Sequence, residues 1–103
     1  MVTPEELNKI DELRFREIIA TVSNSIIRNH GYNFYEYGVY KGKLSYNIIR
    51  EICIQFLNNG WKYVFYKIST KNKHFKKYHY VEFILATNDD IFETIDINDS
   101  FCR

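Results

Sequence analysis

The sequence predicts an α+β domain in which two helices pack on one face of a small mixed three-stranded sheet, in the order α-β-α-β-β. Three observations support this. Two segments show the apolar spacing of one-sided helices and begin with capping residues, three segments are rich in β-branched and aromatic residues, and one proline and four glycines leave few breaks. At 103 residues the chain is expected to form a single domain over 1–103.

Residues 3–30 carry the clearest helix start in the chain. Thr3 can cap, Pro4 takes the first helical position and Glu6 completes a capping box. A helix of this length would be ~40 Å long, against a diameter of ~26 Å for a 100-residue domain. We therefore expect a kink or a projecting end, with residues 5–17 as the projecting part. The predicted apolar face consists of Leu7, Ile10, Phe15, Ile18, Ile19, Val22 and Ile26.

The middle of the chain predicts a strand and then a second helix. Residues 32–40 alternate aromatic with small or polar side chains and end at a glycine turn. Residues 45–59 begin with Ser45 as a cap and end at Gly60. The apolar face of this helix is predicted to hold Ile49, Ile52, Cys53 and Phe56.

Residues 61–69 and 78–87 predict two antiparallel strands, because both are rich in β-branched and aromatic residues. The connection from 32–40 to 61–69 through a helix is long enough for a right-handed parallel crossover, which makes the predicted sheet mixed. On 78–87 the more apolar face holds His79, Val81, Phe83 and Leu85. The buried face of 61–69 stays open between Val64, Tyr66, Ile68 and Trp61, Tyr63, Phe65.

Two hydrophobic faces require a second covering layer. The acidic segment 88–103 or a second copy of the chain could supply it. Within this segment, 91–97 could form a fourth strand or a short helix.

Charge is segregated along the chain, although the net charge is only +1. Between Glu51 and Glu82 there is no carboxylate, whereas the stretch from Glu82 to Asp99, both included, holds six. The carboxylate-free stretch holds six lysines: Lys62, Lys67, Lys71, Lys73, Lys76 and Lys77. This basic, aromatic hairpin is the feature that points toward a partner.

The leading hypothesis is a non-enzymatic protein-interaction module that self-associates through the first helix or the exposed sheet face. The alternative is single-stranded nucleic-acid binding by residues 62–80, since lysines contact phosphates and exposed aromatic rings stack on bases. Lysines at a hairpin end also keep it soluble and protect an edge strand, which needs no ligand. The predicted binding residues are Trp61, Lys62, Tyr63, Tyr66, Lys71, Lys73, Lys76, Lys77, Tyr78 and Tyr80.

Catalytic and metal-binding patterns are weak in this sequence. The three histidines, at 30, 74 and 79, lack the spacing of a zinc site. Glu36, Glu51 and Glu82 could converge as in a metal-dependent nuclease, but no short motif brings them together. We expect no enzyme activity, no metal and no cofactor.

The two cysteines, Cys53 and Cys102, fit free thiols in a reducing compartment. The N-terminus lacks the cationic start of a signal peptide, and no apolar run is long enough to span a membrane. We expect a cytoplasmic protein without membrane contact.

A helix that ends in Asn58-Asn59-Gly60-Trp61 and continues into Lys62-Tyr63-Val64 resembles small proteins of unknown function from AT-rich tailed-phage genomes. The resemblance covers residues 31–87. It implies a viral accessory or virion protein that binds other proteins, as a homo-oligomer or by blocking a host factor, in the host cytoplasm or the virion. It carries no functional residues over to this chain.

Overall fold

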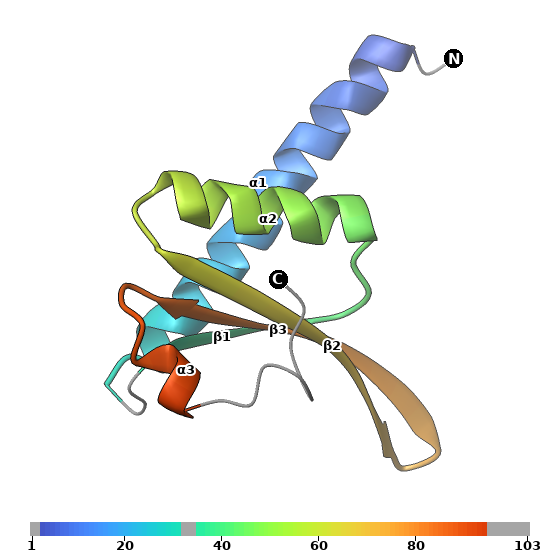
Figure 1. The fold of residues 1–103 in the computed structure, drawn as a ribbon. Helices are drawn as coiled ribbons and strands as arrows, with labels where there is room; N and C mark the ends of the chain where they lie inside the picture. Colours follow the sequence, from blue (N-terminus) through green and yellow to red (C-terminus); the bar gives the residue numbers. More distant parts are fainter. Residues whose placement is uncertain (1–2, 32–34, 95–103) are drawn as a thin grey trace.

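The computed structural model describes residues 3–31 and 35–94. It contains α1 (Pro4–Arg28), β1 (Glu36–Lys41), α2 (Tyr46–Asn58), β2 (Tyr63–Lys73), β3 (Lys76–Ala86) and α3 (Ile91–Thr94) (Figure 1). The predicted α+β class and the order helix-strand-helix-strand-strand are confirmed.

The sheet has the strand order β1-β3-β2, and β3 pairs antiparallel with both neighbours. The prediction of a mixed sheet is therefore wrong. β1 and β2 run in the same direction, as the crossover requires, but β3 lies between them. β3 buries Phe83 and Leu85 on one face and Ile84 and Ala86 on the other. A strand that is apolar on both faces gains most from the central position, because both of its faces can then be covered.

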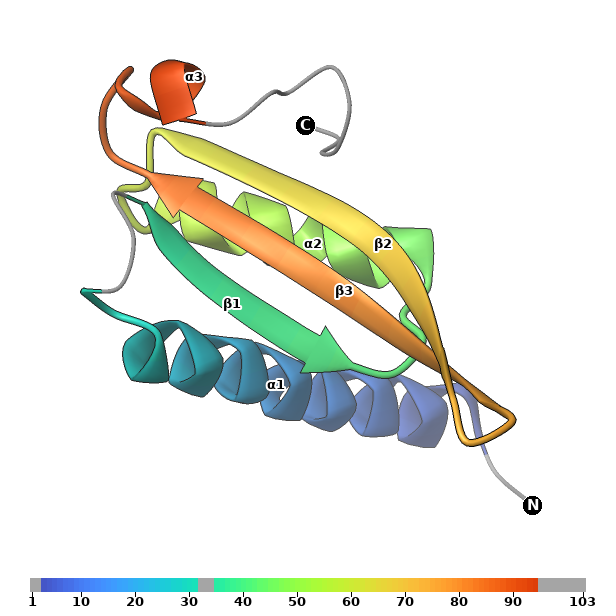
Figure 2. The same cartoon turned by 90° about the horizontal axis from the view of Figure 1, so that it is seen from below.

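Both long helices lie on one face of the sheet, with α1 behind β1 and α2 behind β2 (Figure 2). We call this side the helix face and the opposite side the far face. The predicted apolar set of β3 does face the helices. The main core consists of Ile18, Val22, Ile26, Ile49, Ile52, Val64, Val81, Phe83 and Leu85.

The register of β2 answers the question that the sequence left open, because both of its faces are buried. Val64 lies in the core on the helix face, and Phe65 lies in a second cluster on the far face. That cluster also contains Ile84, Ala86 and Ile91. The second covering layer thus comes from α3, whose Phe92 ring packs edge-on against Tyr63 at 4.9 Å between ring centroids.

α3 is the described part of the predicted segment 91–97, and it is a helix rather than a fourth strand. Residues 95–103 lie outside the described part of the chain, as do residues 32–34 of the predicted first strand.

α1 begins as predicted and projects at its N-terminal end. The backbone N–H of Glu6 donates to Thr3 Oγ1 at 3.2 Å, and the N–H of Thr3 donates to Glu6 Oε2 at 3.4 Å, which is the capping box. At 25 residues the helix is ~37 Å long. Figure 1 shows its first turns extending beyond the sheet and α2, so the expected projecting end is confirmed.

β2 and β3 are longer than the predicted strands and continue through most of the lysine-rich link. They pair from Tyr63 and Ala86 as far as Lys73 and Lys76. Only His74 and Phe75 form the turn. The outer part of this hairpin extends away from the rest of the molecule as a two-stranded ribbon (Figures 1 and 2). We call residues 71–78 the arm.

Candidate nucleic-acid interface

The register of β2 and β3 sorts the side chains of the arm onto two faces. Partners across an antiparallel pair share a face, and successive residues alternate. Lys71 pairs with Tyr78, Lys73 with Lys76, and Ser69 with Tyr80. These pairs share the face of Phe65 and Ile84, which is the far face.

β1 adds a further lysine to the same surface, because Lys41 pairs with Tyr80 from the other side of β3. The result is a group of four lysines and two tyrosines at the arm end of one face of the sheet, next to Lys67 and Glu82, which pair with each other on the same face. We call it the far-face patch: Lys41, Lys71, Lys73, Lys76, Tyr78 and Tyr80.

The side chains of the far-face patch are accessible to a ligand. Its four lysines are exposed, Tyr78 is 40% exposed and Tyr80 is half-buried. The Nζ atom of Lys71 lies 5.7 Å from the centroid of the Tyr80 ring. A lysine over a ring at this distance makes a cation–π contact, so one side of Tyr80 is paired with a cation that also faces solvent.

Lys77 and His79 lie on the opposite side of the ribbon, since they pair with Asn72 and Thr70. The pKa of His79 is lowered, first by desolvation and then by the charges of Lys43 and Lys77. A lowered pKa keeps the imidazole neutral at pH 7. His79 therefore adds no positive charge to the hairpin at pH 7.

Lys62 and Tyr63 take part in a contact at the other end of β2. Asp89 Oδ1 accepts hydrogen bonds from Lys62 Nζ at 2.9 Å and from the Tyr63 hydroxyl at 2.5 Å. The hydroxyl, followed by the ammonium group, lowers the pKa of the Asp89 carboxyl, and the bond to Asp89 raises the pKa values of Tyr63 and Lys62. These two residues hold the β3–α3 connection against β2.

Trp61 and Tyr66 lie on the helix face. Both pack against the main core, and the Tyr66 ring lies edge-on to Tyr46 of α2 at 6.4 Å between centroids. The ten predicted binding residues thus lie in different places. Five of them are in the far-face patch, and Lys77 is behind it. Trp61, Tyr63 and Tyr66 pack within the fold, and the exposed Lys62 is bonded to Asp89.

The described acidic residues after β3 lie at the opposite end of the sheet from the tip of the arm, where Figure 1 shows α3. Asp89, Asp90 and Glu93 follow the end of β3 that pairs with Tyr63. β2 has 11 residues and spans ~36 Å at ~3.3 Å per residue. This is about four Debye lengths at physiological salt, so these acids barely weaken the field at the arm.

The three glutamates considered for a nuclease are not brought together. Glu36 faces the helices and its Oε1 lies 2.7 Å from Nδ1 of His30, whereas Glu82 accepts a hydrogen bond from the Tyr37 hydroxyl at 2.6 Å on the far face. Burial, followed by Glu82, raises the pKa of Tyr37. Glu51 is on α2. Within residues 3–31 and 35–94, no three His, Cys, Asp or Glu side chains are grouped as metal ligands.

Cys53 lies on the inner face of α2 and packs against the main core. Burial raises the pKa of its thiol to about 11. The thiol is therefore protonated at neutral pH, and the thiolate is the reactive form.

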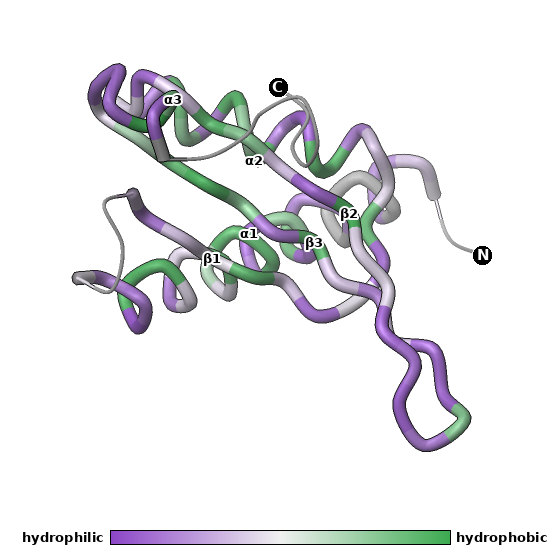
Figure 3. Tube along the Cα trace, turned by 60° about the horizontal axis from the view of Figure 1, so that its bottom comes forward, coloured by the Kyte–Doolittle hydropathy of each residue, from purple (hydrophilic) through white to green (hydrophobic). Residues whose placement is uncertain are grey.

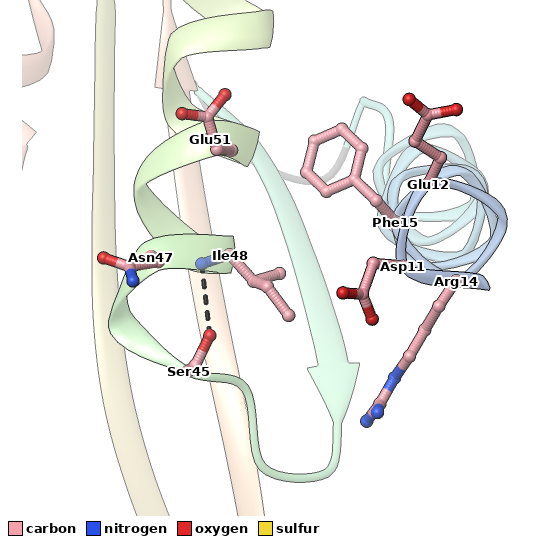
Figure 4. Close-up of a pocket in the computed structure, with 8 residues that line it drawn as sticks. All are labelled: Asp11, Glu12, Arg14, Phe15, Ser45, Asn47, Ile48 and Glu51. Atoms are coloured by element: carbon pink, nitrogen blue, oxygen red, sulfur yellow. Dashed lines mark hydrogen bonds between the residues drawn. The ribbon is translucent and has the colours of Figure 1, made fainter. Parts of the chain in front are cut away.

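A groove of about 540 Å³ separates the first half of α1 from the start of α2. Phe15 and Ile48 project into it from the two helices (Figure 4). Its rim is mostly acidic, with Asp11, Glu12 and Glu51 against Arg14. It lies on the helix side of the molecule, away from the far-face patch.

Sequence reasoning missed two residues of this region, Lys41 and Phe75. Lys41 is distant in sequence and joins the patch only through the β1–β3 register. Phe75 is the one large apolar residue between Lys71 and Lys77, and it is fully exposed. An apolar residue at the centre of a charged run is a signal that could have found it.

None of the described helices combines the length and apolar character needed to cross a bilayer. The chain matches no known protein-family profile, no curated protein and no solved structure. The resemblance to phage proteins therefore stays a prediction.

Proposed function

We propose that this chain is a non-enzymatic protein that binds single-stranded nucleic acid on the far-face patch. One observation supports this more than any other. The strand register places four lysines and two tyrosines on the same face of the sheet, although they come from three strands and are separated by up to 39 positions in the sequence, from Lys41 to Tyr80.

The chemistry of the patch suits an unpaired strand. Lysine ammonium groups neutralise phosphates, and tyrosine rings stack on bases without regard to sequence. Tyr78 and Tyr80 are two residues apart on β3, hence ~6.8 Å apart. Stacked bases repeat every ~3.4 Å, so this spacing leaves room for one base between the two rings.

Protection of the strand edges explains the lysines less well. That role requires charge along an edge, but it does not require the charges to share a face with exposed tyrosines. Three of the four arm lysines, Lys71, Lys73 and Lys76, do share that face, and only Lys77 is on the other side.

Fluorescence anisotropy of a labelled single strand of ~15 nucleotides, titrated at several salt concentrations, tests this function. We expect affinity to fall steeply with salt. Lys76→Ala should weaken binding and reduce the salt slope by ~0.7 for each phosphate that the variant no longer neutralises. Lys77→Ala is the matched control, because it removes the same charge one residue away but on the other face.

The tyrosines are tested separately. Tyr78→Ala should cost ~1–3 kcal/mol of binding free energy, the contribution of one stacked ring, whereas Tyr46→Ala on α2 removes an exposed ring outside the patch and should leave binding unchanged. No change in anisotropy at low salt, or equal losses of affinity in Lys76→Ala and Lys77→Ala, would exclude the far-face patch as the binding surface.

Self-association through α1 is the second candidate, and the projecting first turns of the helix favour it. Leu13 is 60% exposed there, and an antiparallel pair of helices centred near residue 10 would place Glu6 of one copy opposite Arg14 of the other. Such a two-fold contact is self-complementary in charge. A dimer in sedimentation experiments that dissociates with Leu13→Glu but not with Ile27→Glu, which is 70% exposed further along α1, would support it. A monomer at all concentrations would exclude it.

A further inference from the structure

The turn at the tip of the arm has an aromatic residue in an unfavourable backbone conformation. Lys73 and Lys76 pair directly, so His74 and Phe75 form a two-residue loop. Their φ angles are 52° and 64°. Positive φ at both positions is the type I′ turn, in which Asn and Gly are strongly preferred because other side chains are strained there. A turn selected for stability alone would carry Asn-Gly.

Phe75 is also fully exposed, with a relative accessibility of 109%. Among the described residues no other large hydrophobic side chain is as exposed; the next is Ile27 at 70%. Figure 3 shows the arm as a hydrophilic ribbon that ends in a hydrophobic tip. Glycine at this position would remove both the strain and the exposed apolar surface. The phenylalanine is therefore best explained by a partner that covers its ring.

The position of Phe75 relative to the far-face patch indicates what that partner is. Tyr80 and Tyr78 follow one another along β3 toward the tip, and Phe75 is the next ring in that direction. The two tyrosines lie on a face of the ribbon, so they meet bases that lie across it. Phe75 stands beyond the last strand pair, where its ring can stack on the exposed end of a base stack. Apolar side chains of minor-groove-binding proteins also contact base faces, by inserting between base steps.

We propose that Phe75 stacks on the terminal base pair of a duplex while the far-face patch holds the adjoining single strand. The preferred ligand is then a junction between duplex and single strand. This deepens the proposed function and rests on it. Lys73 and Lys76 flank the turn and contact phosphates on the two sides of the junction.

A lipid surface is the competing partner for a basic arm with an aromatic tip, because anionic lipids attract lysines and the interface accepts apolar rings. A bilayer would meet the arm end-on, and it would leave Tyr80 and Lys41 without a role. The single face shared by these residues and the arm favours nucleic acid.

The experiment compares three nucleic acids: a single strand of ~12 nucleotides, a blunt duplex, and a duplex carrying that strand as a tail. A fluorescent base analogue occupies the first unpaired position of the tail. Vesicles with and without anionic phosphatidylserine are tested alongside. We expect the wild type to bind the tailed duplex about tenfold more tightly than the single strand, the gain from one additional stacked ring, with a change in the analogue's fluorescence.

Three variants separate the ring from the turn. His74→Asn together with Phe75→Gly keeps a type I′ turn but lacks the ring, so it should melt at a higher temperature, lose the preference for the tailed duplex and retain the affinity and salt slope for the single strand. His74→Asn alone keeps the ring and should keep the preference. Phe75→Trp should keep it as well, because a larger ring also stacks.

The outcomes separate junction recognition by Phe75 from single-strand binding by the far-face patch. Equal wild-type affinity for the tailed duplex and the single strand overturns the junction while leaving single-strand binding in place. A preference that survives removal of the ring overturns the role of Phe75. No binding to any of the three nucleic acids overturns both proposals, and vesicle binding that depends on Phe75 would then assign the tip to a lipid surface.

Discussion

A single missing Cβ allows α1 to pack closely on β1. A Cβ on Gly38 would lie 2.6 Å from Ile26 Cγ1 and 3.1 Å from the carbonyl oxygen of Val22. The same approach lets α1 satisfy the free edge of β1. The Ser25 hydroxyl accepts from the backbone N–H of Val39 at 2.9 Å, and the Asn29 amide donates to the carbonyl of Tyr37 at 3.3 Å. A helix thus covers an edge strand that would otherwise be open to pairing.

Gly38→Ala is expected to destabilise the fold by ~1–3 kcal/mol, because the added methyl overpacks the helix–sheet contact. Urea unfolding measures this destabilisation. Combining Gly38→Ala with Ile26→Ala removes the nearest clashing atom, so the destabilisation of the double variant should be smaller than the sum of the two single effects. Strict additivity would show that the contact between α1 and β1 does not depend on this close approach.

At the level of elements, the helices and the inner halves of the strands could be predicted from the sequence, because caps and apolar periodicity are local signals. The strand order could not. Its signal is the continuous apolar run Phe83-Ile84-Leu85-Ala86, which marks a strand covered on both faces. Alternation further along the same strand favours a single apolar face and hides this signal.

The length of the hairpin could not be predicted for a different reason. Turns are recognised from Gly, Asn, Asp and Pro, and the turn here is His74-Phe75. The lysines around it therefore have the composition of a loop. The face on which each side chain lies depends on the register, and the register depends on the position of the turn. Five of the six residues of the far-face patch could therefore be predicted, but neither Lys41 nor the division of the side chains between two faces could be.

The connection from β3 to α3 is expected to weaken in acid. Because the folded-state pKa of Asp89 is lowered from 3.8, its contribution to stability is present above pH 3.8 and disappears as the pH falls through the folded-state pKa. Asp89→Asn should lack this part of the acid dependence. Tyr63→Phe, which removes the hydroxyl donor to Asp89 and keeps the ring, should shift the transition to higher pH.

Unfolding midpoints of the three proteins measured over a pH range of about 2 to 6 test this expectation. Identical acid dependence of the wild type and Asp89→Asn would show that the hydrogen bonds of Asp89 contribute nothing to the docking of α3.

At the scale of the whole molecule, the buried core lies at one end of the sheet and the proposed binding surface lies at the other. The radius of gyration of 15.1 Å exceeds the ~13 Å expected for a compact domain of this size, in keeping with the projecting arm and helix end. Every buried side chain of β2 and β3 lies outside the arm. The arm therefore adds positive charge and lengthens the molecule, but it adds no side chain to the core.

Replacing residues 70–79 by Asn-Gly should leave the fold intact, because Ser69 and Tyr80 are paired in the same hydrogen-bonding phase as Lys73 and Lys76 and can be joined by a two-residue turn. We expect stability within ~1 kcal/mol of the wild type and loss of single-strand affinity. Circular dichroism and the anisotropy titration report the two properties separately. Failure of this shortened chain to fold would show that the arm is part of the folding unit.

The central place of β3 also dictates when the sheet can form during synthesis. β1 is made early, but residues 80–85, with which it pairs, are made more than 35 residues later. β2 meets the same partner across a two-residue turn, which closes within microseconds. The hairpin is therefore expected to form first and β1 to join it last, after closing the longer loop. Until β3 has been synthesised, both earlier strands lack a neighbour, and α1 can cover only the edge of β1 that faces away from β3.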